Sequence, residues 1–441
     1  MPRFSPQPQK GFADYFPDVL RTFRYVEEHL QRTAALFGCE EYDGPVLEPL
    51  EIYAAKSGEE LVREQAYVVK DKGGRELALR PEMTPTLARM VAQVQKSATR
   101  PIRWFSIPTC FRYERPQRGR VREFGQANVD ILGPDTSDAE LEIFALIRHF
   151  MESFGASEKI YRIRYSSRRY LDALLSRVIG VPAERTVEVR KMIDRRDKLE
   201  PAEFEKWVRQ VFPEGGIAER VLSLTEFTDA ANPPLPDVPA AFRESAGYRE
   251  LVEFQHKVAE VGLGPVAVFD PTIVRGLDYY TGIVYEVHDV GTENRRALFG
   301  GGRYDNLLEL FSNEGMTGTG FGMGILTVKL FLETYGLLPA GVAQADRRGA
   351  LYVACPAAAQ RGFAFEVAAT LRKAGIACEV DLEFQKLGKQ LGRASSRGYA
   401  FAAIVGESEA TSRTVTLKTL TTGTQETVAL ADLPGWKGFV A

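Results

Sequence analysis

The sequence predicts an α+β protein, in which an antiparallel sheet is mixed with helices and a smaller α/β domain follows. Three observations support this prediction. Strand-like and helical segments mix over the first 160 residues, a charged helical stretch runs from about 160 to 260, and strands alternate with helices after 350. We therefore expect one domain made of 1–160 and 263–336, a helical insertion at 161–262, a linker at 337–349 and a second domain at 350–441.

The first part contains three expected helices and several strands. Apolar residues recur at helical spacing over 17–37, 84–95 and 138–154. The segment 39–53 is typical of a strand and turn, and 64–80 predicts a β-hairpin closed at Lys72-Gly73-Gly74. The segments 102–114 and 123–133 are strand-like, with a polar loop between them.

The middle and the tail differ from the first part. The segments 166–178, 185–212 and 248–262 are charged and helical, which predicts the insertion, and a strand-rich pattern resumes at 268. In the tail, strand-like stretches at 350–356, 376–382 and 399–406 alternate with helical ones at 363–375 and 384–398. This alternation predicts a mostly parallel sheet.

Composition limits the possible functions. The 441 residues carry a net charge of −3, so any nucleic-acid contact depends on local basic clusters. The four cysteines are far apart, which argues against a zinc site or a disulfide framework and fits a reducing cytoplasm. No apolar run approaches the 18 residues of a membrane helix. We expect a cytoplasmic protein without a membrane span or a metal-ligating cluster.

The densest chemical signal is the stretch RYERPQRGRVREFGQ at 112–126. Its arginines suit phosphate oxygens, because the planar guanidinium binds them with two parallel hydrogen bonds. Pro116 and Gly119 argue against a helix across it. A solvated basic loop explains the charge equally well, but the flanking strands favour a nucleotide site.

Three further segments are candidates for binding. Glu82 follows a strand end, where it suits an amino group; the alternative is that Thr84 or Glu82 caps the next helix. Arg275 precedes a buried strand, as a catalytic cation or as the partner of Asp278. The triple glycine at 300–302 allows close approach of a ligand, or forms a turn. The segment 319–333 is typical of a glycine turn leading into a buried helix.

A fifth signal lies in the tail. Four cations recur at spacings that share one face of a helix, at Lys386, Lys389, Arg393 and Arg397. Such a stripe suits a nucleic-acid backbone, and a solvated helix face is the alternative.

Taken together, these motifs resemble the histidyl-tRNA synthetases, which are class II ligases. The segments RGLDYY and GGGRYDNL look like the two histidine signatures of that family, 112–124 looks like class II motif 2, and PVLEPLEIY falls at motif 1. The resemblance implies an antiparallel-sheet catalytic domain with a helical insertion, an anticodon-binding domain at 350–441, and usually a homodimer. It also implies ATP as substrate, Mg²⁺, and tRNA(His) and histidine as partners.

The resemblance assigns roles to individual residues. Arg112 and Arg275 would be catalytic at the α-phosphate. ATP would be bound by Arg112, Glu114, Arg120, Phe124, Gly322 and Gly324. Histidine would be bound by Glu82, Thr84, Gln126, Asp130, Arg275, Tyr280 and Tyr304. The tRNA would be contacted by Arg115, Gln117, Lys386, Lys389, Arg393 and Arg397.

Two positions depart from the family pattern. Gly125 replaces a bulkier residue, which we expect to reshape the pocket wall. Thr327 stands where motif 3 usually supplies an arginine to the γ-phosphate, and Lys329 points about 200° away around a helix. Losing that contact would cost roughly 1.5–3 kcal/mol unless magnesium or another arginine, such as Arg120, replaces it.

The sequence therefore predicts a histidine–tRNA ligase. The alternative is a paralogue without ligase activity, such as a regulatory subunit of ATP phosphoribosyltransferase. The missing motif 3 arginine favours this alternative, while the C-terminal domain and the intact Arg112, Glu114 and Arg275 favour the ligase.

Overall fold

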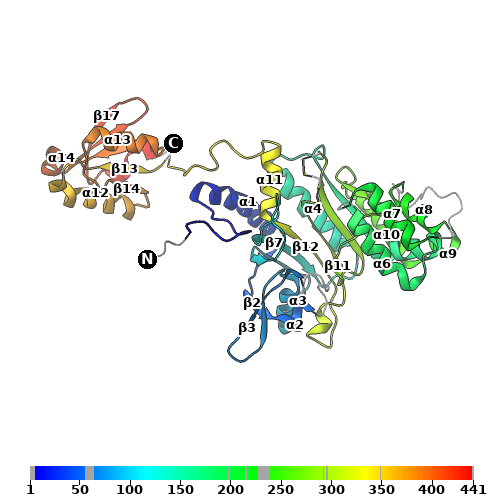
Figure 1. Cartoon of the computed structure of the whole chain (residues 1–441). Coiled ribbons are helices and arrows are strands. Elements are labelled where there is room, and N and C mark those ends of the chain that lie inside the picture. The colour runs from blue at the N-terminus through cyan, green and yellow to red at the C-terminus, as the bar shows by residue number, and fades with distance from the viewer. Residues whose placement is uncertain are drawn as a thin grey trace. The chain divides into compact units, whose positions relative to one another are not determined.

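A computed structural model describes residues 5–54, 64–196, 199–213, 216–226, 239–291, 293–294, 296–347 and 349–439. The chain divides into two compact units, 1–340 and 341–441 (Figure 1). Two expected segments, 185–212 and 337–349, include residues 197–198 and 348, which lie outside the described residues. Among the helices that are described, none is long and apolar enough to cross a bilayer.

The first unit is built on two sheets. Its strands are β1 (Glu40–Glu41), β2 (Leu47–Pro49), β3 (Tyr67–Lys70), β4 (Glu76–Leu79), β5 (Ile102–Ser106), β6 (Thr109–Phe111), β7 (Glu123–Leu132), β8 (Tyr161–Ser167), β9 (Ala267–Phe269), β10 (Ile283–Asp289), β11 (Phe299–Tyr304) and β12 (Gly318–Gly324). Its helices are α1 (Pro17–Leu36), α2 (Leu50–Ala54), α3 (Thr84–Val94), α4 (Asp138–Glu152), α5 (Arg168–Leu174), α6 (Thr186–Arg195), α7 (Pro201–Val211), α8 (Ile217–Leu222), α9 (Ala240–Arg243), α10 (Ala246–Glu260) and α11 (Ile325–Thr334). The helices expected at 17–37, 84–95 and 138–154 and the hairpin β3–β4 are confirmed.

The large sheet has the order β1-β5-β7-β12-β11-β10-β8-β9, with β6 paired to β7. The described pairings are antiparallel except at its two edges, where β1–β5 and β8–β9 are parallel. The triple glycine at 300–302 lies in the central strand β11, so the alternative of a turn there is not seen. The glycines at 320–324 lie in the central strand β12, so the turn expected at the start of 319–333 is wrong. At Gly300, Gly301 and Gly320, neighbouring backbone or side-chain atoms lie too close for a Cβ atom.

One face of this sheet is covered by α1, α4 and α11. Each helix buries an apolar stripe at spacings of three and four, such as Val26, Leu30 and Ala34 of α1. On β7, Ala127 and Val129 point into the same core. The opposite face of β7 is therefore available for polar side chains, because successive residues of a strand point to opposite faces.

The helices α5 to α10 gather at one end of the large sheet (Figure 1). The insertion was expected to begin at 161, but Tyr161–Ser167 is a strand that pairs with β10 and β9. Helices begin only at Arg168. The long helical stretch expected at 185–212 is divided into α6 and α7, and Pro201 occupies the first turn of α7, where its missing N–H costs nothing.

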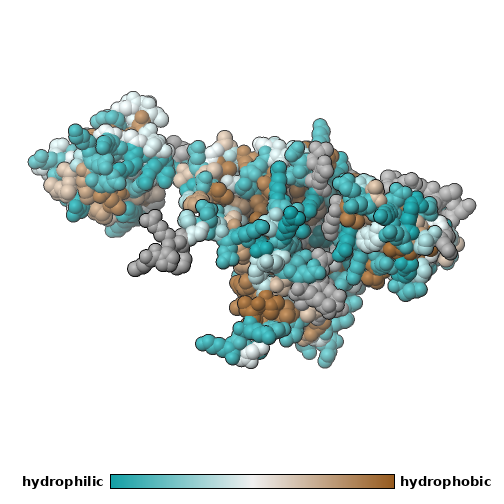
Figure 2. Space-filling view, in the orientation of Figure 1, coloured by the Kyte–Doolittle hydropathy of each residue, from teal (hydrophilic) through white to brown (hydrophobic). Residues whose placement is uncertain are grey.

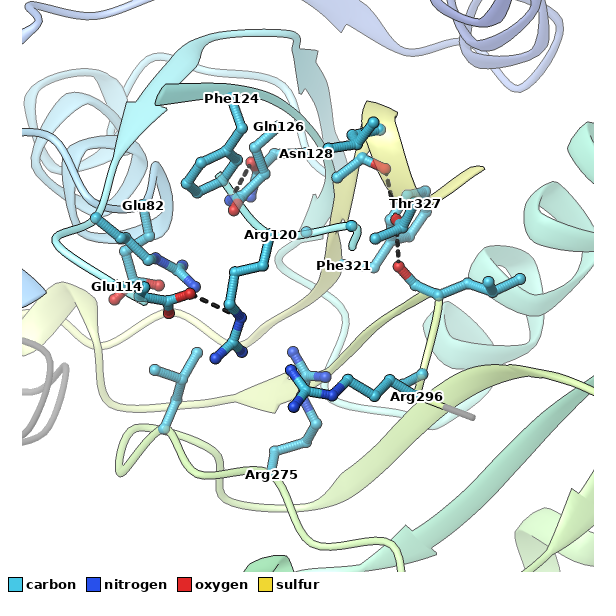
Figure 3. Close-up of a pocket in the computed structure, with 18 of the residues that line it drawn as sticks. Glu82, Glu114, Arg120, Phe124, Gln126, Asn128, Arg275, Arg296, Phe321 and Thr327 are labelled. Atoms are coloured by element: carbon cyan, nitrogen blue, oxygen red, sulfur yellow. Dashed lines mark hydrogen bonds and ion pairs between the residues drawn. The ribbon is translucent and has the colours of Figure 1, made fainter. Parts of the chain in front are cut away.

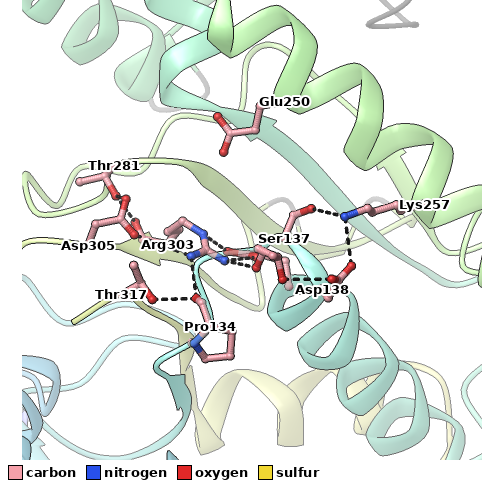
Figure 4. Close-up of polar contacts among 12 residues, drawn as sticks. Pro134, Ser137, Asp138, Glu250, Lys257, Thr281, Arg303, Asp305 and Thr317 are labelled. Atoms are coloured by element: carbon pink, nitrogen blue, oxygen red, sulfur yellow. Dashed lines mark hydrogen bonds and ion pairs between the residues drawn. The ribbon is translucent and has the colours of Figure 1, made fainter. Parts of the chain in front are cut away.

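A buried ion pair ties β11 to α4 (Figure 4). Arg303 donates to both carboxylate oxygens of Glu140, at 2.8 and 2.6 Å, and to the carbonyls of Pro134 and Thr136. Nearby, Lys257 of α10 pairs with Asp138 at the start of α4, at 3.1 Å. Arg303 and Tyr304 are successive residues of β11, so their side chains point to opposite faces of the sheet. The Arg303 side chain pairs with α4, and the Tyr304 side chain faces a cavity on the other side.

The second sheet, β2-β4-β3, has an exposed apolar face. Leu47 lies opposite Leu79, which lies opposite Tyr67; the next register joins Pro49, Leu77 and Val69. Leu47 and Val69 are each more than 40% exposed, at 43% and 42%, whereas Glu48 and Ala78 on the other face are buried. Figure 2 shows apolar residues gathered over β2 and β3, next to the hydrophilic hairpin tip.

The second unit is an α/β domain. Its strands are β13 (Leu351–Ala354), β14 (Cys378–Val380), β15 (Phe401–Ile404), β16 (Thr414–Thr419) and β17 (Gln425–Ala429), and its helices are α12 (Arg361–Lys373), α13 (Leu387–Ser396) and α14 (Glu407–Ser412). The order is β14-β13-β15-β16-β17. The first three strands are parallel, as expected, but β16 and β17 pair antiparallel, so the sheet is mixed rather than mostly parallel.

Candidate active site

A cavity of about 440 Å³ lies over β7, β11 and β12 (Figure 3). Residues far apart in sequence meet there, because their strands are neighbours in the sheet. All residues predicted to bind histidine or ATP line it, namely Glu82, Thr84, Arg112, Glu114, Arg120, Phe124, Gln126, Asp130, Arg275, Tyr280, Tyr304, Gly322 and Gly324.

One wall of the cavity is formed by alternate residues of β7. Phe124, Gln126, Asn128 and Asp130 all face it. The Gln126 side-chain amide donates to Asn128 Oδ1 at 3.0 Å, which orients both groups. Asn128 was missed from the sequence, although its even spacing from Gln126 and Asp130 would have identified it.

Gly125 lies on the other face of β7. A side chain there would contact Ile325 of α11, 3.4 Å from the position of a Cβ atom. The expected effect of this glycine on the pocket wall is therefore wrong, since position 125 faces the helix.

Asp130 lies at the buried end of this wall. The Tyr304 hydroxyl donates to its Oδ1 at 2.7 Å, whereas Oδ2 has no hydrogen-bond partner among the described residues. Burial raises the pKa of Asp130 to about 7, although the Tyr304 hydrogen bond opposes this shift. Gly320 is required beside it, because a Cβ atom there would lie 2.1 Å from Asp130 Oδ1.

Glu82 and Thr84 lie where β4 leads into α3. The Tyr279 hydroxyl donates to Glu82 Oε2 at 3.0 Å, and Tyr279 itself lines the cavity. The alternative role of Glu82 or Thr84 as a helix cap is not seen, because Met83 is the N-cap residue and no side chain caps α3. Tyr279 was missed because its neighbour Tyr280 was assigned to the pocket instead.

Arg275 reaches the cavity from the loop before β10. It donates to Glu286 Oε1 at 2.9 Å and to the Gly300 carbonyl at 3.3 Å, and its partner is therefore Glu286 rather than Asp278. Burial opposes ionisation of Glu286, but its hydrogen bond with His288 and the charge of Arg275 lower its pKa. The pair keeps Arg275 in place.

A second arginine holds the Arg275 loop from outside the cavity. Arg168, the first residue of α5, donates to the carbonyls of Arg275, Leu277 and Asp278 at 2.8, 2.5 and 3.4 Å. No sequence pattern pointed to Arg168, because its partners are main-chain atoms more than 100 residues away.

The segment before β7 lines the cavity through Arg112, Glu114 and Arg120. Arg112 donates to the Pro81 carbonyl at 2.9 Å, and its guanidinium lies 5.5 Å from the ring centroid of Phe124. Glu114 and Arg120 form an ion pair at 2.7 Å. Arg115 and Gln117 are exposed and do not line the cavity.

Thr327 and Lys329 lie on different sides of α11. Thr327 lines the cavity, and its hydroxyl lies 2.7 Å from the carbonyl oxygens of both Gly324 and Leu298. Lys329 pairs with Glu333 at 2.6 Å and lies over the ring of Phe23 in α1. The expectation that Lys329 points away from the site is confirmed.

The loop between β10 and β11 also lines the cavity, through Glu293, Asn294 and Arg296. Sequence reasoning missed all three, since the segment GTENRRALF carries neither a periodic pattern nor a known motif.

In the second unit, the four predicted tRNA-binding cations lie along or beside α13. Lys386 is the N-cap residue and Lys389 lies in the first turn; both are exposed. Arg393 is paired with Asp381 and Glu383, and Arg397 with Glu379. The stripe thus consists of two exposed lysines and two arginines already paired with carboxylates.

Comparisons with known proteins point to one family. The family model of histidyl-tRNA synthetase matches residues 11–328, and that of an anticodon binding domain matches 350–436. A relative from Leptospira biflexa, named histidine–tRNA ligase, is 41% identical over 424 residues, which cover 96% of this chain and 95% of the relative. Another with that name, from Opitutus terrae, is 37% identical over 95% of this chain and 94% of its own.

A solved structure has the same fold. The histidyl-tRNA synthetase from Nostoc sp. PCC 7120 superposes with a TM-score of 0.76 over 98% of this chain and 99% of its own, at 23% identity. The family model spans most of the chain, and the relatives match it over nearly their whole length. The chain therefore belongs to the histidyl-tRNA synthetase family.

Proposed function

We propose that this histidine–tRNA ligase carries out both steps of its reaction in the cavity over β7, β11 and β12. Histidine is first joined to ATP as histidyl-adenylate, and the histidyl group is then transferred to the 3′ end of tRNA(His). One observation carries the proposal: a buried polar wall ending at Asp130 and a group of arginines share a single cavity.

The polar wall suits a histidine side chain. Gln126, Asp130 and Tyr304 offer both hydrogen-bond donors and acceptors to an imidazole ring, and Tyr280 closes the pocket. An amino acid without ring nitrogens would leave these buried groups unpaired, which penalises its binding. Glu82 and Thr84 are assigned to the amino group of histidine.

The arginine side suits ATP. Phe124 stacks on adenine, Glu114 accepts a hydrogen bond from its amino group, and Arg112 and Arg120 bind phosphate oxygens. Gly322 and Gly324 keep the strand surface flat beneath the nucleotide. The Glu114–Arg120 ion pair separates when each residue takes its own part of ATP.

Arg275 and Arg112 act on the reacting atoms. A carboxylate oxygen of histidine attacks the α-phosphorus, an oxygen–phosphorus bond forms, and the bond to the β-phosphate oxygen breaks to release pyrophosphate. Both reactants are negative, so fixed cations at the junction stabilise the charge that builds up in the transition state. Glu286 holds Arg275 in position without reorganisation during the step.

Magnesium fits the donor set of the cavity. Among the described residues there is no group of three or more His, Cys, Asp and Glu side chains that could hold a metal. Mg²⁺ instead takes one or two carboxylates together with substrate phosphates, and Glu293 on the cavity wall offers such a carboxylate. Bound with ATP, the ion neutralises part of the polyphosphate charge.

The tRNA meets both units. Arg115 and Gln117 are exposed on the hairpin beside the cavity, where the acceptor end enters. Lys386 and Lys389 contact phosphates of the tRNA, with Arg393 and Arg397 behind them. We place the protein in the cytoplasm, in line with its four free cysteines.

The exposed face of β2-β4-β3 is where a second copy of the chain binds. Its members Leu47, Pro49, Val69 and Leu77 are apolar, and a contiguous exposed patch of this kind marks an interface. Because a twofold dimer places the same patch on both partners, an apolar face can pair with itself.

A paralogue without ligase activity is not favoured. The relatives named histidine–tRNA ligase match both units of this chain, including the segment 350–436 that matches an anticodon binding domain.

The test is histidine-dependent exchange of pyrophosphate into ATP, followed by charging of tRNA. We expect both activities in the full chain and no exchange in Arg275→Ala, because the junction loses its fixed cation. Folded protein without exchange would overturn the function, whereas exchange that survives in Arg275→Ala would overturn only the role of Arg275. A matched control is Arg164→Ala, which removes a partly exposed cation on β8 that pairs with Asp270 outside the cavity.

A further inference from the structure

We propose that Arg296 binds the β- and γ-phosphate end of ATP and that Thr327 holds its loop in place. The inference rests on the proposed ATP site and adds a cation that comes from the β10–β11 loop rather than from α11.

Arg296 points into the cavity. Figure 3 shows Arg120, Arg275 and Arg296 reaching toward the same space from three directions. Cations that share a partly enclosed space repel one another, and an anion bound between them removes this repulsion. The arrangement therefore favours a ligand with several negative charges.

Arg296 differs from the other two arginines in its partners. Arg120 is paired with Glu114 at 2.7 Å and Arg275 with Glu286 at 2.9 Å. The contact that the structure records for Arg296 is a hydrogen bond to the neutral Gln117 side chain, at 3.4 Å, and no carboxylate of the described residues lies within ion-pair distance of it. Its charge is thus free to compensate a ligand, whereas those of Arg120 and Arg275 are already partly compensated.

Thr327 connects this loop to α11. Its hydroxyl lies 2.7 Å from the Leu298 carbonyl, two residues after Arg296, and at the same distance from the Gly324 carbonyl. A residue in the first turn of α11 therefore fixes the end of the loop that carries Arg296. In this chain position 327 acts on the polyphosphate through that loop.

Arg118 is the rival candidate, because it also lines the cavity and no ion pair is recorded for it within the described residues. It belongs to the 112–124 hairpin, on the wall shared with Arg120, whereas Arg296 approaches from the opposite loop. The two can be separated by experiment.

The test compares ligands that share adenosine and the α-phosphate. Binding of ATP, AMP and pyrophosphate is measured by calorimetry for Arg296→Gln, with Arg118→Gln and Arg295→Gln as variants of equal charge change. We expect Arg296→Gln to lower the affinity for ATP and for pyrophosphate by about 10- to 100-fold, which is the effect of one charge-assisted contact. The affinity for AMP should fall by less than about twofold. Arg296→Lys should retain part of the affinity.

The anchor is tested separately. Thr327→Val keeps the shape of the side chain and removes its hydroxyl, so it should lower the affinity for ATP by a smaller factor than Arg296→Gln does. In the double variant, Thr327→Val should cause little further loss of ATP affinity beyond that of Arg296→Gln. Thr327→Arg should restore ATP binding to Arg296→Gln.

Three results would overturn the inference. They are equal losses for ATP and AMP in Arg296→Gln, a selective loss in Arg118→Gln or Arg295→Gln but not in Arg296→Gln, and full additivity of the double variant. If the wild-type protein bound none of the three ligands, the proposed ATP site itself would fail, which is a distinguishable outcome.

Discussion

Asp130 combines burial, a tyrosine hydrogen bond and an oxygen without a partner in the described residues. Only 2% of the residue is exposed, and the carboxyl is adjacent to no described cation. Such a group resists ionisation, because its charge would be poorly solvated. It can therefore donate a proton to one imidazole nitrogen or, when histidine brings a positive charge, ionise and pair with it.

The first prediction concerns Asp130→Asn. The folded pKa of about 7 lies above the ordinary value of about 3.9, so the folded protein binds more protons than the unfolded chain between these pH values. The stabilising contribution is complete below about pH 4 and is lost as pH rises through about 7, on the order of 4 kcal/mol in all. Asp130→Asn should remove this part of the pH dependence.

Urea denaturation of the wild type and of Asp130→Asn from pH 5 to 8 measures this pH dependence of the unfolding free energy. The difference in unfolding free energy between wild type and Asp130→Asn should drift in favour of the variant as pH rises. A constant difference would mean that Asp130 has an ordinary pKa. Glu142→Gln, on α4 and paired with Arg103 outside the cavity, serves as the control carboxylate.

At the scale of elements, the start of α5 supports the first signature loop. Arg168 donates hydrogen bonds to three carbonyls of the segment that carries Arg275, so these bonds connect the helical insertion directly to the active-site loop. Arg168→Met keeps the apolar stem and removes these hydrogen bonds. We expect kcat for pyrophosphate exchange to fall about tenfold or more with little change in KM for histidine, because each lost hydrogen bond costs about 1 kcal/mol.

The distinguishing measurement is the split between kcat and KM, together with partial rescue by Arg168→Lys. A merely destabilised protein would lose active fraction and would recover its activity at low temperature. Arg169→Met is the matched control, because Arg169 is the next residue of α5 and its guanidinium pairs with Glu250 and Asp305 rather than with the Arg275 loop.

The helix α13 permits a test of tRNA binding. Changing Lys386 and Lys389 together to alanine should lower the affinity for tRNA by about tenfold or more. It should also reduce the slope of log K against log salt by about 1.4–1.8, because two phosphate contacts are lost. Pyrophosphate exchange should be unchanged. Lys373 and Lys437, exposed elsewhere in the same unit, form the control pair; an equal loss in that pair would make the effect one of net charge.

The sequence predicted the elements whose periodicity is local. Helices α1, α3 and α4 and the hairpin β3–β4 follow from the spacing of apolar residues or from turn glycines. It did not predict β8, because Tyr161–Ser167 precedes helices and contains two arginines, and only its partners β10 and β9 make it a strand. Similarly, Gly300 to Gly302 look like a turn until the neighbouring strands are in place.

The site was predictable where residues belong to motifs and not where tertiary contacts alone bring them in. Asp130 and Tyr304 could be assigned from their segments. Arg168 and Arg296 could not, since the first acts through main-chain carbonyls and the second lies in a loop without pattern.

At the scale of the whole molecule, the apolar face of β2-β4-β3 predicts self-association. Val69→Asp places a charge on that face, and the same charge enters both copies of a twofold interface, so the dimer should dissociate at micromolar concentration. Sedimentation equilibrium measures the mass. Val261→Asp, at the 53% exposed end of α10, is the control and should leave the dimer intact. A wild-type chain of 49.1 kDa in solution would contradict the interface.

The two-faced strand β7 has a consequence for directed evolution. Positions 126, 128 and 130 face the cavity, while 127, 129 and 131 belong to the core. A saturation library limited to the three even positions would therefore vary the lining of the cavity while leaving the apolar core unchanged. Deleting one residue of the strand would instead exchange its faces, and should produce insoluble protein rather than an enzyme of altered selectivity.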